Sequence, residues 1–445
     1  MAKLFGTDGV RGLANCDLTP ELAFQLGRAA GSLLKAPSQR SAMLIGRDSR
    51  LSGSMLEGAL TAGICSAGVD VYLAGVITTP AVAYLTKKLG YCAGAVISAS
   101  HNPAPDNGIK FFNNQGYKLA DGLEEEIEKN ISGGLLGLAR PTGPELGRSI
   151  PMPDALDRYI RFLKSTLSCG LSGLKIVVDC ANGAASNIAP RLLRELGAQV
   201  ISLHDLPDGN NINDNCGSTH PAYLQEAVIK YRAQLGLAYD GDADRVIAVD
   251  DKGQLVDGDK ILVVCGLALQ EEKQLDNKIV VTVMSNLGLK QAFEKAGVKV
   301  YETSVGDRFV LEKMLETGAA LGGEQSGHII FSKYATTGDG ILTGLQLLAI
   351  LKKSGKSLSE LAQQMTTLPQ LLTNVKVRQK NGWENNQRIR AAIAEGEKAL
   401  AGKGRLFVRA SGTESLIRVM AEGPDSHELE RLAGQVVHVI AAELG

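Results

Sequence analysis

Val96-Ile-Ser-Ala-Ser-His-Asn-Pro103 is the stretch around which the rest of the chain is organised. Apolar residues suited to a strand run into two serines and a histidine, and Pro103 prevents regular continuation. Because the residue before a proline is biased away from helix, Asn102 is expected in extended or turning backbone. Ser100 should then stand on a short loop at a strand end with its hydroxyl exposed, as a nucleophile would. An ordinary serine-rich turn has the same pattern, so other parts of the chain must decide between the two.

Strand-like and helix-like segments alternate on both sides of this stretch. Apolar periodicity predicts helices that are separated by short apolar strands, and this alternation is typical of parallel βαβ units. We predict three successive α/β domains with mixed, largely parallel sheets and a smaller α+β domain at the C-terminus. A segment rich in glycine and proline, residues 133–153, is predicted to be a linker. The expected domains are residues 1–150, 151–255, 256–368 and 369–445.

Composition narrows the class of protein. Lys and Arg number 47 and Asp and Glu number 48, so the chain as a whole has no basic surface for DNA or anionic lipid. Its seven cysteines are scattered without a CxxC pair, which is typical of reduced core cysteines. No apolar run approaches the roughly 18 residues of a membrane span, and no leader-like segment begins the chain. We therefore expect a cytoplasmic protein that binds neither nucleic acid nor membrane.

Three carboxylates on alternate residues form the strongest local signal, in Asp240-Gly-Asp-Ala-Asp-Arg245 between two predicted strands. Two carboxylates about 5 Å apart repel by roughly 3 kcal/mol at an effective dielectric constant near 20. A bound cation relieves this repulsion, and oxygen-only ligands favour magnesium, calcium or manganese. An EF-hand is excluded because Arg245 and Asp251 stand where that loop needs Gly and Glu. A solvated acidic loop remains the alternative.

Magnesium usually shares its coordination shell with phosphate oxygens, so the acidic loop indicates phosphate chemistry. Arg409-Ala-Ser-Gly-Thr-Glu-Ser415 offers backbone amides, hydroxyls and a guanidinium between two strands, a composition that can hold phosphate or form a simple hairpin turn. Gly322-Gly-Glu-Gln-Ser-Gly-His328 suits sugar hydroxyls or a turn. Lys110 lies beside Ile109 and Phe111, and such apolar neighbours could lower its pKa for acid–base work. A lysine that simply reaches solvent is the alternative reading.

Seven motifs, taken together and in this order, resemble the α-D-phosphohexomutase family. They are FGTDGVRG at the start, SASHNP, GIKFF, DGDADR, VGDR, GEQSGH and RASGTES, and they span essentially the whole chain. The resemblance implies four domains around a central cleft. It also implies a phosphoserine at Ser100 that holds the transferable phosphate, and Mg²⁺ bound by that phosphate with Asp240, Asp242 and Asp244.

The resemblance assigns roles to the remaining candidates. Glu324 and Ser326 would bind sugar hydroxyls, and the non-reacting phosphate would be held by Arg409, Ser411, Gly412, Thr413 and Arg418. The reacting phosphate would be surrounded by Arg11, His101, Lys110, Arg245 and His328, with Lys110 as the leading acid–base candidate.

The implied reaction interconverts glucosamine 6-phosphate and glucosamine 1-phosphate through a 1,6-bisphosphate, on the route to UDP-N-acetylglucosamine, with a hexose or hexosamine 1,6-bisphosphate as activator. Gln325 favours the glucosamine branch by resemblance only, so glucose or mannose phosphate remains an alternative substrate. A non-catalytic sugar-phosphate sensor is a rival of another class, although Ser100 and all three carboxylates are present. A metal-dependent phosphatase or kinase is a third alternative, but the sequence contains no nucleotide-binding loop for it. A homodimer is possible.

Overall fold

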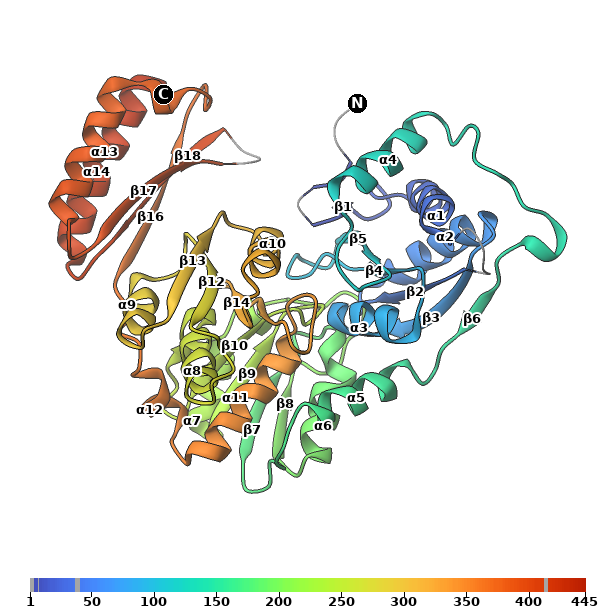
Figure 1. Ribbon diagram of the computed structural model, residues 1–445, viewed down its shortest axis with the longest axis horizontal. Coiled ribbons are helices and arrows are strands. Elements are labelled where there is room, and N and C mark those ends of the chain that lie inside the picture. The colour runs from blue at the N-terminus through green and yellow to red at the C-terminus, as the bar shows by residue number, and fades with distance from the viewer. Residues whose placement is uncertain (1–3, 7, 37–40, 412–414) are drawn as a thin grey trace. The chain divides into compact units, whose positions relative to one another are not determined.

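A computed structural model describes residues 4–6, 8–36, 41–411 and 415–445. The chain forms two compact units, the first made of residues 1–284 and 297–364 and the second of residues 285–296 and 365–445. Within the described residues, the first unit holds three sheets and the second holds one (Figure 1). The three sheets of the first unit alternate with helices along the chain, and the second unit is smaller and of the α+β class. This arrangement confirms the predicted fold class.

The first sheet has the strand order β1-β5-β4-β2-β3-β6. Strands β4, β2, β3 and β6 are parallel, whereas β1 and β5 are antiparallel to their neighbours. The strands are β1 (Val10–Leu13), β2 (Ala42–Arg47), β3 (Asp70–Val76), β4 (Ala93–Ile97), β5 (Asp106–Asn113) and β6 (Ser149–Pro151). The helices are α1 (Pro20–Leu34), α2 (Gly53–Ser66), α3 (Thr79–Leu89) and α4 (Asp121–Ser132).

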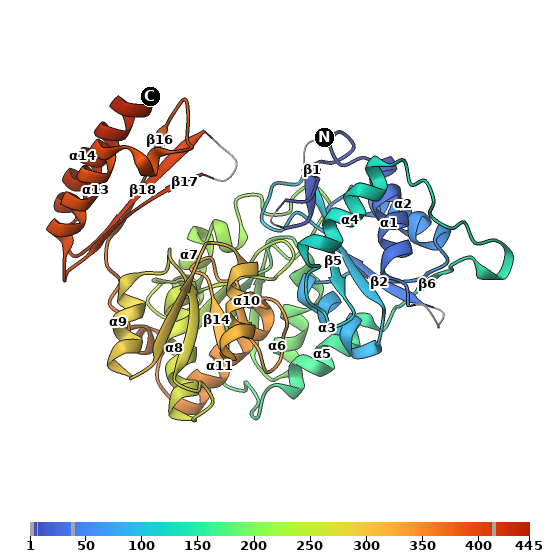
Figure 2. The same cartoon turned by 45° about the horizontal axis from the view of Figure 1, so that its top comes forward.

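Helices cover both faces of this sheet (Figures 1 and 2). Met43 and Ile45 share an apolar core with residues of α1, α2 and α4. Gly46 points the other way, where an added Cβ would meet Val82 of α3 at 2.6 Å. A strand buried on both faces has no room for polar side chains, so the polar residues gather in the loops that follow the strands.

Residues 133–153 are not a free linker, and that prediction was wrong. Strand β6 pairs with β3 and extends the first sheet. The buried guanidinium of Arg28 donates hydrogen bonds to the carbonyls of Leu138 and Ala139, at 3.3 and 3.2 Å. Glycine and proline indicate irregular backbone, and irregular backbone can still make tertiary contacts.

The second sheet has the order β11-β10-β9-β7-β8. Strands β9, β7 and β8 are parallel, and β10 and β11 are added in antiparallel pairs. The strands are β7 (Lys175–Asp179), β8 (Gln199–Leu203), β9 (Leu235–Tyr239), β10 (Val246–Asp250) and β11 (Leu255–Val256). Around them lie α5 (Ala155–Ser165), α6 (Ala189–Glu195), α7 (Ala222–Tyr231) and the short 3-10 helices Ala184–Asn187 and Gly217–Thr219.

The third sheet has the order β13-β12-β14-β15, with only β15 antiparallel. Its strands are β12 (Lys278–Thr282), β13 (Lys299–Thr303), β14 (Leu321–Gly323) and β15 (Ile329–Phe331). Its helices are α8 (Gly258–Glu271), α10 (Asp307–Thr317), α11 (Gly340–Ser354) and α12 (Leu358–Ala362). Strands β4, β9 and β14 each lead directly into one of the polar motifs, so each sheet contributes a loop at a strand end.

The second unit is built on an antiparallel sheet with the order β16-β18-β17. It comprises α9 (Leu287–Lys295), β16 (Gln370–Lys376), a 3-10 turn (Trp383–Asn385), α13 (Gln387–Leu400), β17 (Arg405–Ala410), β18 (Leu416–Glu422) and α14 (Ser426–Leu444). Ile389 of α13 and Val436 of α14 pack on Ile417 and Val419 of β18 in its core. This core is separate from those of the first unit.

None of the helices in the described part of the chain has the length and apolar character needed to cross a membrane. All seven cysteines are free thiols.

Candidate active site

Ser100 lies on the loop after β4, in a left-handed backbone conformation with φ of 53°. Its hydroxyl donates a hydrogen bond to Oδ2 of Asp240 at 2.6 Å. Nδ1 of His101 lies 3.4 Å from Oγ of Ser100. The residue is only 1% exposed, so the predicted exposed hydroxyl is wrong. The acidic loop after β9 covers it, a contact between residues 140 positions apart that no local pattern reveals.

Arg50 holds the backbone of this loop, a role that no sequence motif indicated. Its fully buried side chain pairs with Oδ2 of Asp48 at 2.9 Å. The guanidinium donates hydrogen bonds to four carbonyls, those of Ser100 (3.0 Å), Asn102 (2.8 Å), Asp106 (3.0 Å) and Pro103. The available signal was the position of Gly46-Arg-Asp-Ser-Arg50, a charged segment directly after a buried strand.

A second support for the serine loop comes from the second sheet. Asn213 donates its side-chain amide to the carbonyls of Ser100 and Asn102, at 2.8 and 2.9 Å. Gly241 approaches the same loop so closely that a Cβ would lie 2.6 Å from the Ser100 carbonyl oxygen. No motif in the sequence indicated this role for the polar segment of residues 208–215.

The three carboxylates of Asp240, Asp242 and Asp244 lie together in the loop between β9 and β10, buried and with one oxygen of each within 4.8 Å of the others. Burial, together with the charges of Asp244 and Asp242, raises the pKa of Asp240 well above its ordinary value. Oδ1 of Asp242 and Oδ1 of Asp244 are buried without a hydrogen-bond partner. Buried carboxylate oxygens that lack donors fit a hard cation such as Mg²⁺, which prefers oxygen ligands.

Lys110, on β5, is surrounded by carboxylates and not by the apolar environment that its neighbours in sequence suggested. Nζ lies 2.9 Å from Oδ2 of Asp8, 3.2 Å from Oδ2 of Asp242 and 3.9 Å from Oδ2 of Asp244. Burial disfavours the ammonium ion, but these carboxylates outweigh it and raise the pKa of Lys110. The expectation of a lowered pKa was wrong because Ile109 and Phe111 point to the other face of the strand.

Three further predicted residues add cationic or polar groups around the carboxylates. Nη1 of Arg245 lies 3.2 Å from Nδ1 of His101, and burial together with the charges of Arg245 and Arg11 lowers the pKa of His101 to about 4. The imidazole of His101 is therefore neutral at pH 7. Arg11 donates to the carbonyl of Ala99 at 3.2 Å and pairs with Asp8.

His328 closes the same site from the third sheet. Its Nε2 accepts a hydrogen bond from the backbone of Gly338 at 3.0 Å, and its Nδ1 lies 3.7 Å from Oδ2 of Asp244. Burial opposes its protonation, but the interaction with Asp244 outweighs burial and raises the pKa of His328.

Glu324 and Ser326 lie in the turn between β14 and β15. Oε1 of Glu324 accepts a hydrogen bond from the backbone amide of Gly306 at 3.1 Å, and Ser326 is exposed. Gln325 directs its amide to Oδ2 of Asp257 at 3.4 Å, so this side chain serves the start of α8.

An ion network that the sequence did not reveal joins the first and third sheets. Lys118 pairs with Oδ1 of Asp8 at 2.5 Å and also with Asp307 at the start of α10. Arg308 pairs with Asp121 of α4. Each pair joins residues that lie more than a hundred positions apart, so the fold alone creates it.

The second unit contains the predicted phosphate loop. Arg409 and Arg418 stand directly opposite each other on β17 and β18. Burial and the charge of Arg418 lower the pKa of Arg409, because two neighbouring cations disfavour each other. Ser411 is buried, and its carbonyl accepts a hydrogen bond from Lys380, a further residue that the sequence did not suggest. Gly412 and Thr413 lie outside the described residues.

The first unit therefore brings Ser100, three carboxylates and a set of basic residues together from three sheets. A hydroxyl beside buried acids and surrounded by cations is typical of enzymes that transfer phosphoryl groups, in which positioning and charge neutralisation dominate. Arg409, Ser411 and Arg418 all belong to the second unit, where Arg409 and Arg418 are cross-strand neighbours.

Comparison with known proteins identifies the family. Four family models match the chain, the phosphoglucomutase/phosphomannomutase alpha/beta/alpha domains I (residues 2–135), II (157–253) and III (257–368), and the C-terminal domain (372–439). The chain belongs to the phosphoglucomutase/phosphomannomutase family.

Individual relatives show which members of this family the chain is similar to. The chain is 59% identical to a phosphoglucosamine mutase of Desulforamulus reducens and 57% identical to one of Pelotomaculum thermopropionicum, in each case over 99% of both chains. Among solved structures, a phosphoglucomutase/phosphomannomutase family protein of Burkholderia thailandensis superimposes with a TM-score of 0.81 at 27% identity, covering 99% of this chain and 97% of that one.

Proposed function

We propose that the chain is a phosphoglucosamine mutase, an isomerase that interconverts glucosamine 6-phosphate and glucosamine 1-phosphate. The substrate class rests on the relatives that carry this name at 59% and 57% identity. The observation that carries the chemistry is the Ser100 hydroxyl, 2.6 Å from Asp240 inside a buried cluster of three carboxylates. A phosphate on this serine would be repelled by the three carboxylates. A cation between the phosphate and the carboxylates removes that repulsion and allows Ser100 to carry the phosphate.

Ser100 acts as the carrier of the transferable phosphate. In the first half-reaction the bond between Oγ of Ser100 and phosphorus breaks while a bond forms between that phosphorus and a free sugar hydroxyl, which loses its proton. The sugar then carries phosphates at positions 1 and 6, and it turns round in the site. In the second half-reaction the other phosphate returns to Oγ of Ser100, and the freed sugar oxygen takes up a proton.

Asp240, Asp242 and Asp244, with a phosphate oxygen on Ser100, would hold Mg²⁺, which supplies positive charge against the transferring phosphoryl group. Arg11, Lys110 and Arg245 supply the remaining positive charge. His328 lies beside Asp244, and His101 steadies the phosphate from beside Ser100. Lys110 is proposed as the acid–base residue in its protonated form: the carboxylates that raise its pKa keep the ammonium ion charged, 3.2 Å from Asp242, so it can donate a proton to the departing oxygen and cannot serve readily as a base.

Glu324 and Ser326 would bind the sugar hydroxyls, and Arg409, Ser411, Gly412, Thr413 and Arg418 the non-reacting phosphate. Two opposed guanidinium groups on one hairpin support an anion site there, since an anion removes their repulsion. We assign these roles to domains spanning residues 1–150, 151–255, 256–368 and 369–445. Seven free thiols support a reducing, cytoplasmic location, and a homodimer remains a proposal.

The decisive experiment supplies glucosamine 6-phosphate, Mg²⁺ and a catalytic amount of a hexose 1,6-bisphosphate, and measures glucosamine 1-phosphate. Robust turnover of glucose or mannose phosphate with none of the glucosamine ester would establish the rival mutase. Tight binding of the sugar phosphate without turnover would establish a sensor.

The phosphoserine has its own test. Intact mass spectrometry is expected to show a phosphorylated fraction that disappears in Ser100→Ala, together with the loss of most activity. Ser54→Ala is the matched control, because this exposed serine on α2 bonds only weakly to the carbonyl of Leu51, at 3.5 Å. Wild-type turnover by Ser100→Ala would refute the phosphoserine mechanism.

A further inference from the structure

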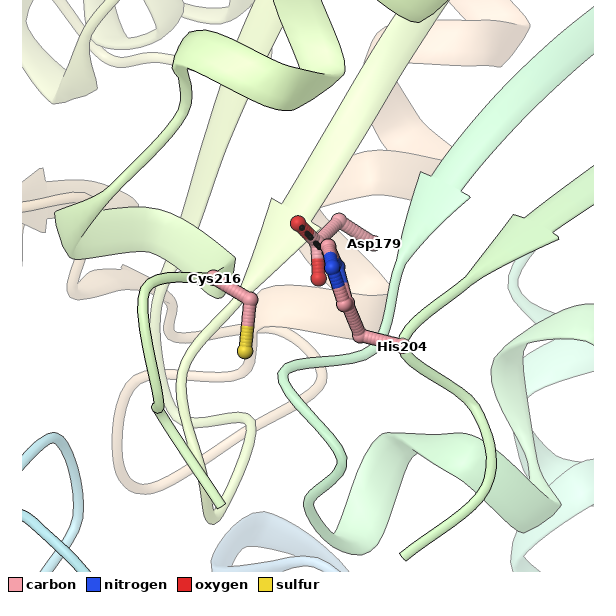
Figure 3. Close-up of side chains that lie close together, drawn as sticks. All are labelled: Asp179, His204 and Cys216. Atoms are coloured by element: carbon pink, nitrogen blue, oxygen red, sulfur yellow. Dashed lines mark ion pairs between the residues drawn. The ribbon is translucent and has the colours of Figure 1, made fainter. Parts of the chain in front are cut away.

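We propose a second metal site, formed by Asp179, His204 and Cys216, that takes a thiophilic divalent cation such as Zn²⁺ (Figure 3). Asp179 ends β7, His204 follows the parallel neighbour β8, and Cys216 precedes the 3-10 helix Gly217–Thr219. The three potential ligand atoms lie within 4.8 Å of one another. This site is distinct from the three carboxylates, and its existence does not depend on the proposed mutase activity.

The pair formed by His204 and Asp179 is the first observation that points to a ligand. Nδ1 of His204 lies 3.0 Å from Oδ2 of Asp179, close enough for an ion pair when the imidazole is protonated, but the two atoms do not meet in good hydrogen-bonding geometry. A cation between the nitrogen and the carboxylate would take the place of that proton and bind both atoms directly. Figure 3 shows the imidazole and the carboxylate turned towards each other, with the thiol of Cys216 beside them.

The carboxylate of Asp179 is oriented by backbone donors, as the carboxylate ligands of metals commonly are. Its Oδ1 accepts a hydrogen bond from Ala181 at 2.9 Å, and its Oδ2 accepts one from Gly217 at 3.0 Å. Such outer partners hold a ligand in place and account for much of a site's affinity. Asp179 and Cys216 are buried, and the side chain of His204 is 28% exposed, which leaves one side open to a water molecule.

The donor set selects the class of metal. One oxygen, one nitrogen and one sulfur ligand suit Zn²⁺ and similar transition metals, whereas Mg²⁺ and Ca²⁺ require oxygen ligands. Ligands about 2.0–2.3 Å from Zn²⁺ stand roughly 3.3–3.8 Å apart in a tetrahedron. Nδ1 of His204 and Oδ2 of Asp179 are 3.0 Å apart, so only a small opening of this pair is needed to admit the metal. On binding, the thiol of Cys216 gives its proton to solvent.

Hydrogen bonds of Asn213 connect the proposed metal site to the serine loop. Asn213 stands three residues before Cys216, and its amide side chain holds the carbonyls of Ser100 and Asn102. Its backbone amide donates to the carbonyl of Ala181 at 2.9 Å, two residues after Asp179. A metal that ties Asp179 to Cys216 would therefore reduce the motion of residues 211–217 and so position Asn213 against the serine loop.

The test titrates metal-free full-length protein with Co²⁺ and with Zn²⁺ in the presence of excess Mg²⁺, which occupies the three carboxylates. Co²⁺ is expected to produce a near-ultraviolet thiolate charge-transfer band that saturates at one equivalent. Zn²⁺ is expected to displace Co²⁺ and remove this band, and competition with a chromophoric chelator measures the Zn²⁺ affinity.

Variants assign the band to these residues. Cys216→Ser should abolish it. His204→Gln removes a direct ligand and should weaken Zn²⁺ binding by at least the roughly 10–100-fold that loss of an outer partner costs. Cys180→Ser, at the neighbouring buried cysteine, and Asp240→Asn, in the carboxylate cluster, are matched controls that should retain the band. Absence of a band in the wild-type protein, or its persistence in Cys216→Ser, would overturn the proposal and leave a simple Asp–His ion pair beside a thiol.

Amide hydrogen exchange tests the connection to the serine loop without measuring activity. Zn²⁺ is expected to slow exchange across residues 211–217 in the wild-type protein and to have no effect in Cys216→Ser. Unchanged exchange in a protein that shows the Co²⁺ band would refute the positioning role, because the metal would then be bound without ordering the loop.

Discussion

Arg50 offers the sharpest test of how the fold builds the serine loop. We predict that Arg50→Met destabilises the protein strongly and lowers turnover. The side chain of Arg50 is fully buried against Asp48 and bonds the carbonyls of Ser100 and Asn102, among others. Methionine has similar bulk, so the substitution removes the charge and the donors and leaves the volume nearly filled.

The magnitude follows from the buried ion pair. Removing one partner leaves the carboxylate of Asp48 without its cation, which costs about 3–5 kcal/mol. For a domain of about 150–250 residues this corresponds to a fall in melting temperature of about 6–20 °C. The four carbonyls lose the guanidinium at the same time, although Asn213 still donates to those of Ser100 and Asn102. A displacement of the loop by about 1 Å is expected to lower kcat by up to about a hundredfold.

Arg158→Met is the matched control, since Arg158 forms an exposed ion pair with Asp154 one turn away, at 2.7 Å. A contact of that kind contributes up to about 1 kcal/mol. Chemical denaturation of both variants measures the difference directly. A free energy of unfolding for Arg50→Met within about 1 kcal/mol of that for Arg158→Met would refute the predicted cost of the buried pair.

The pH dependence of the same variant provides a second check. Burial raises the pKa of Asp48, although Arg50 and Ser98 partly oppose this. The folded protein therefore binds the Asp48 proton more tightly than the unfolded chain, and stability falls as pH rises from the ordinary aspartate range through the raised folded value. Loss of Arg50 raises that pKa further, so Arg50→Met should be more destabilising at pH 8 than at pH 5. Adding Asp48→Asn should remove this difference.

Three further outcomes are expected. Mg²⁺ at about a hundred times its dissociation constant should stabilise the wild-type protein by about 2.7 kcal/mol, measured as a rise in melting temperature that EDTA reverses. Asp240→Asn should lose this rise, and an equal rise in the variant would contradict the carboxylate site. Lys110→Met should lower kcat by at least about a hundredfold and KM little, because it removes a cation that lies among Asp8, Asp242 and Asp244; steady-state kinetics at saturating Mg²⁺ measure it, with Lys110→Arg expected to recover part of the rate. Arg409→Met should raise KM for the sugar phosphate at least tenfold, because it removes a guanidinium that would bind the phosphate. Thermal stability should not fall, since the substitution relieves the repulsion with Arg418. An unchanged KM would exclude the phosphate role.

The sequence alone determined the class of fold and most of the candidate chemistry. Apolar periodicity predicts the alternating strands and helices because each apolar strand or helix face must be buried. The three aspartates are recognisable because their spacing along the chain already creates the repulsion that a cation relieves. The start of α1 follows from local chemistry: Pro20 is the first helical residue, and the Thr19 side chain accepts a hydrogen bond from the backbone amide of Leu22.

Only the tertiary structure decided how these parts meet. The burial of Ser100, the carboxylates around Lys110, and the contacts of Arg50 and Asn213 join residues 50 to 140 positions apart. The same applies to Asp179, His204 and Cys216, which are separated in sequence and converge where parallel strands end. The physical reason is that burial and charge environment depend on what packs from other segments, whereas the sequence pattern reports only the covalent neighbours of each residue.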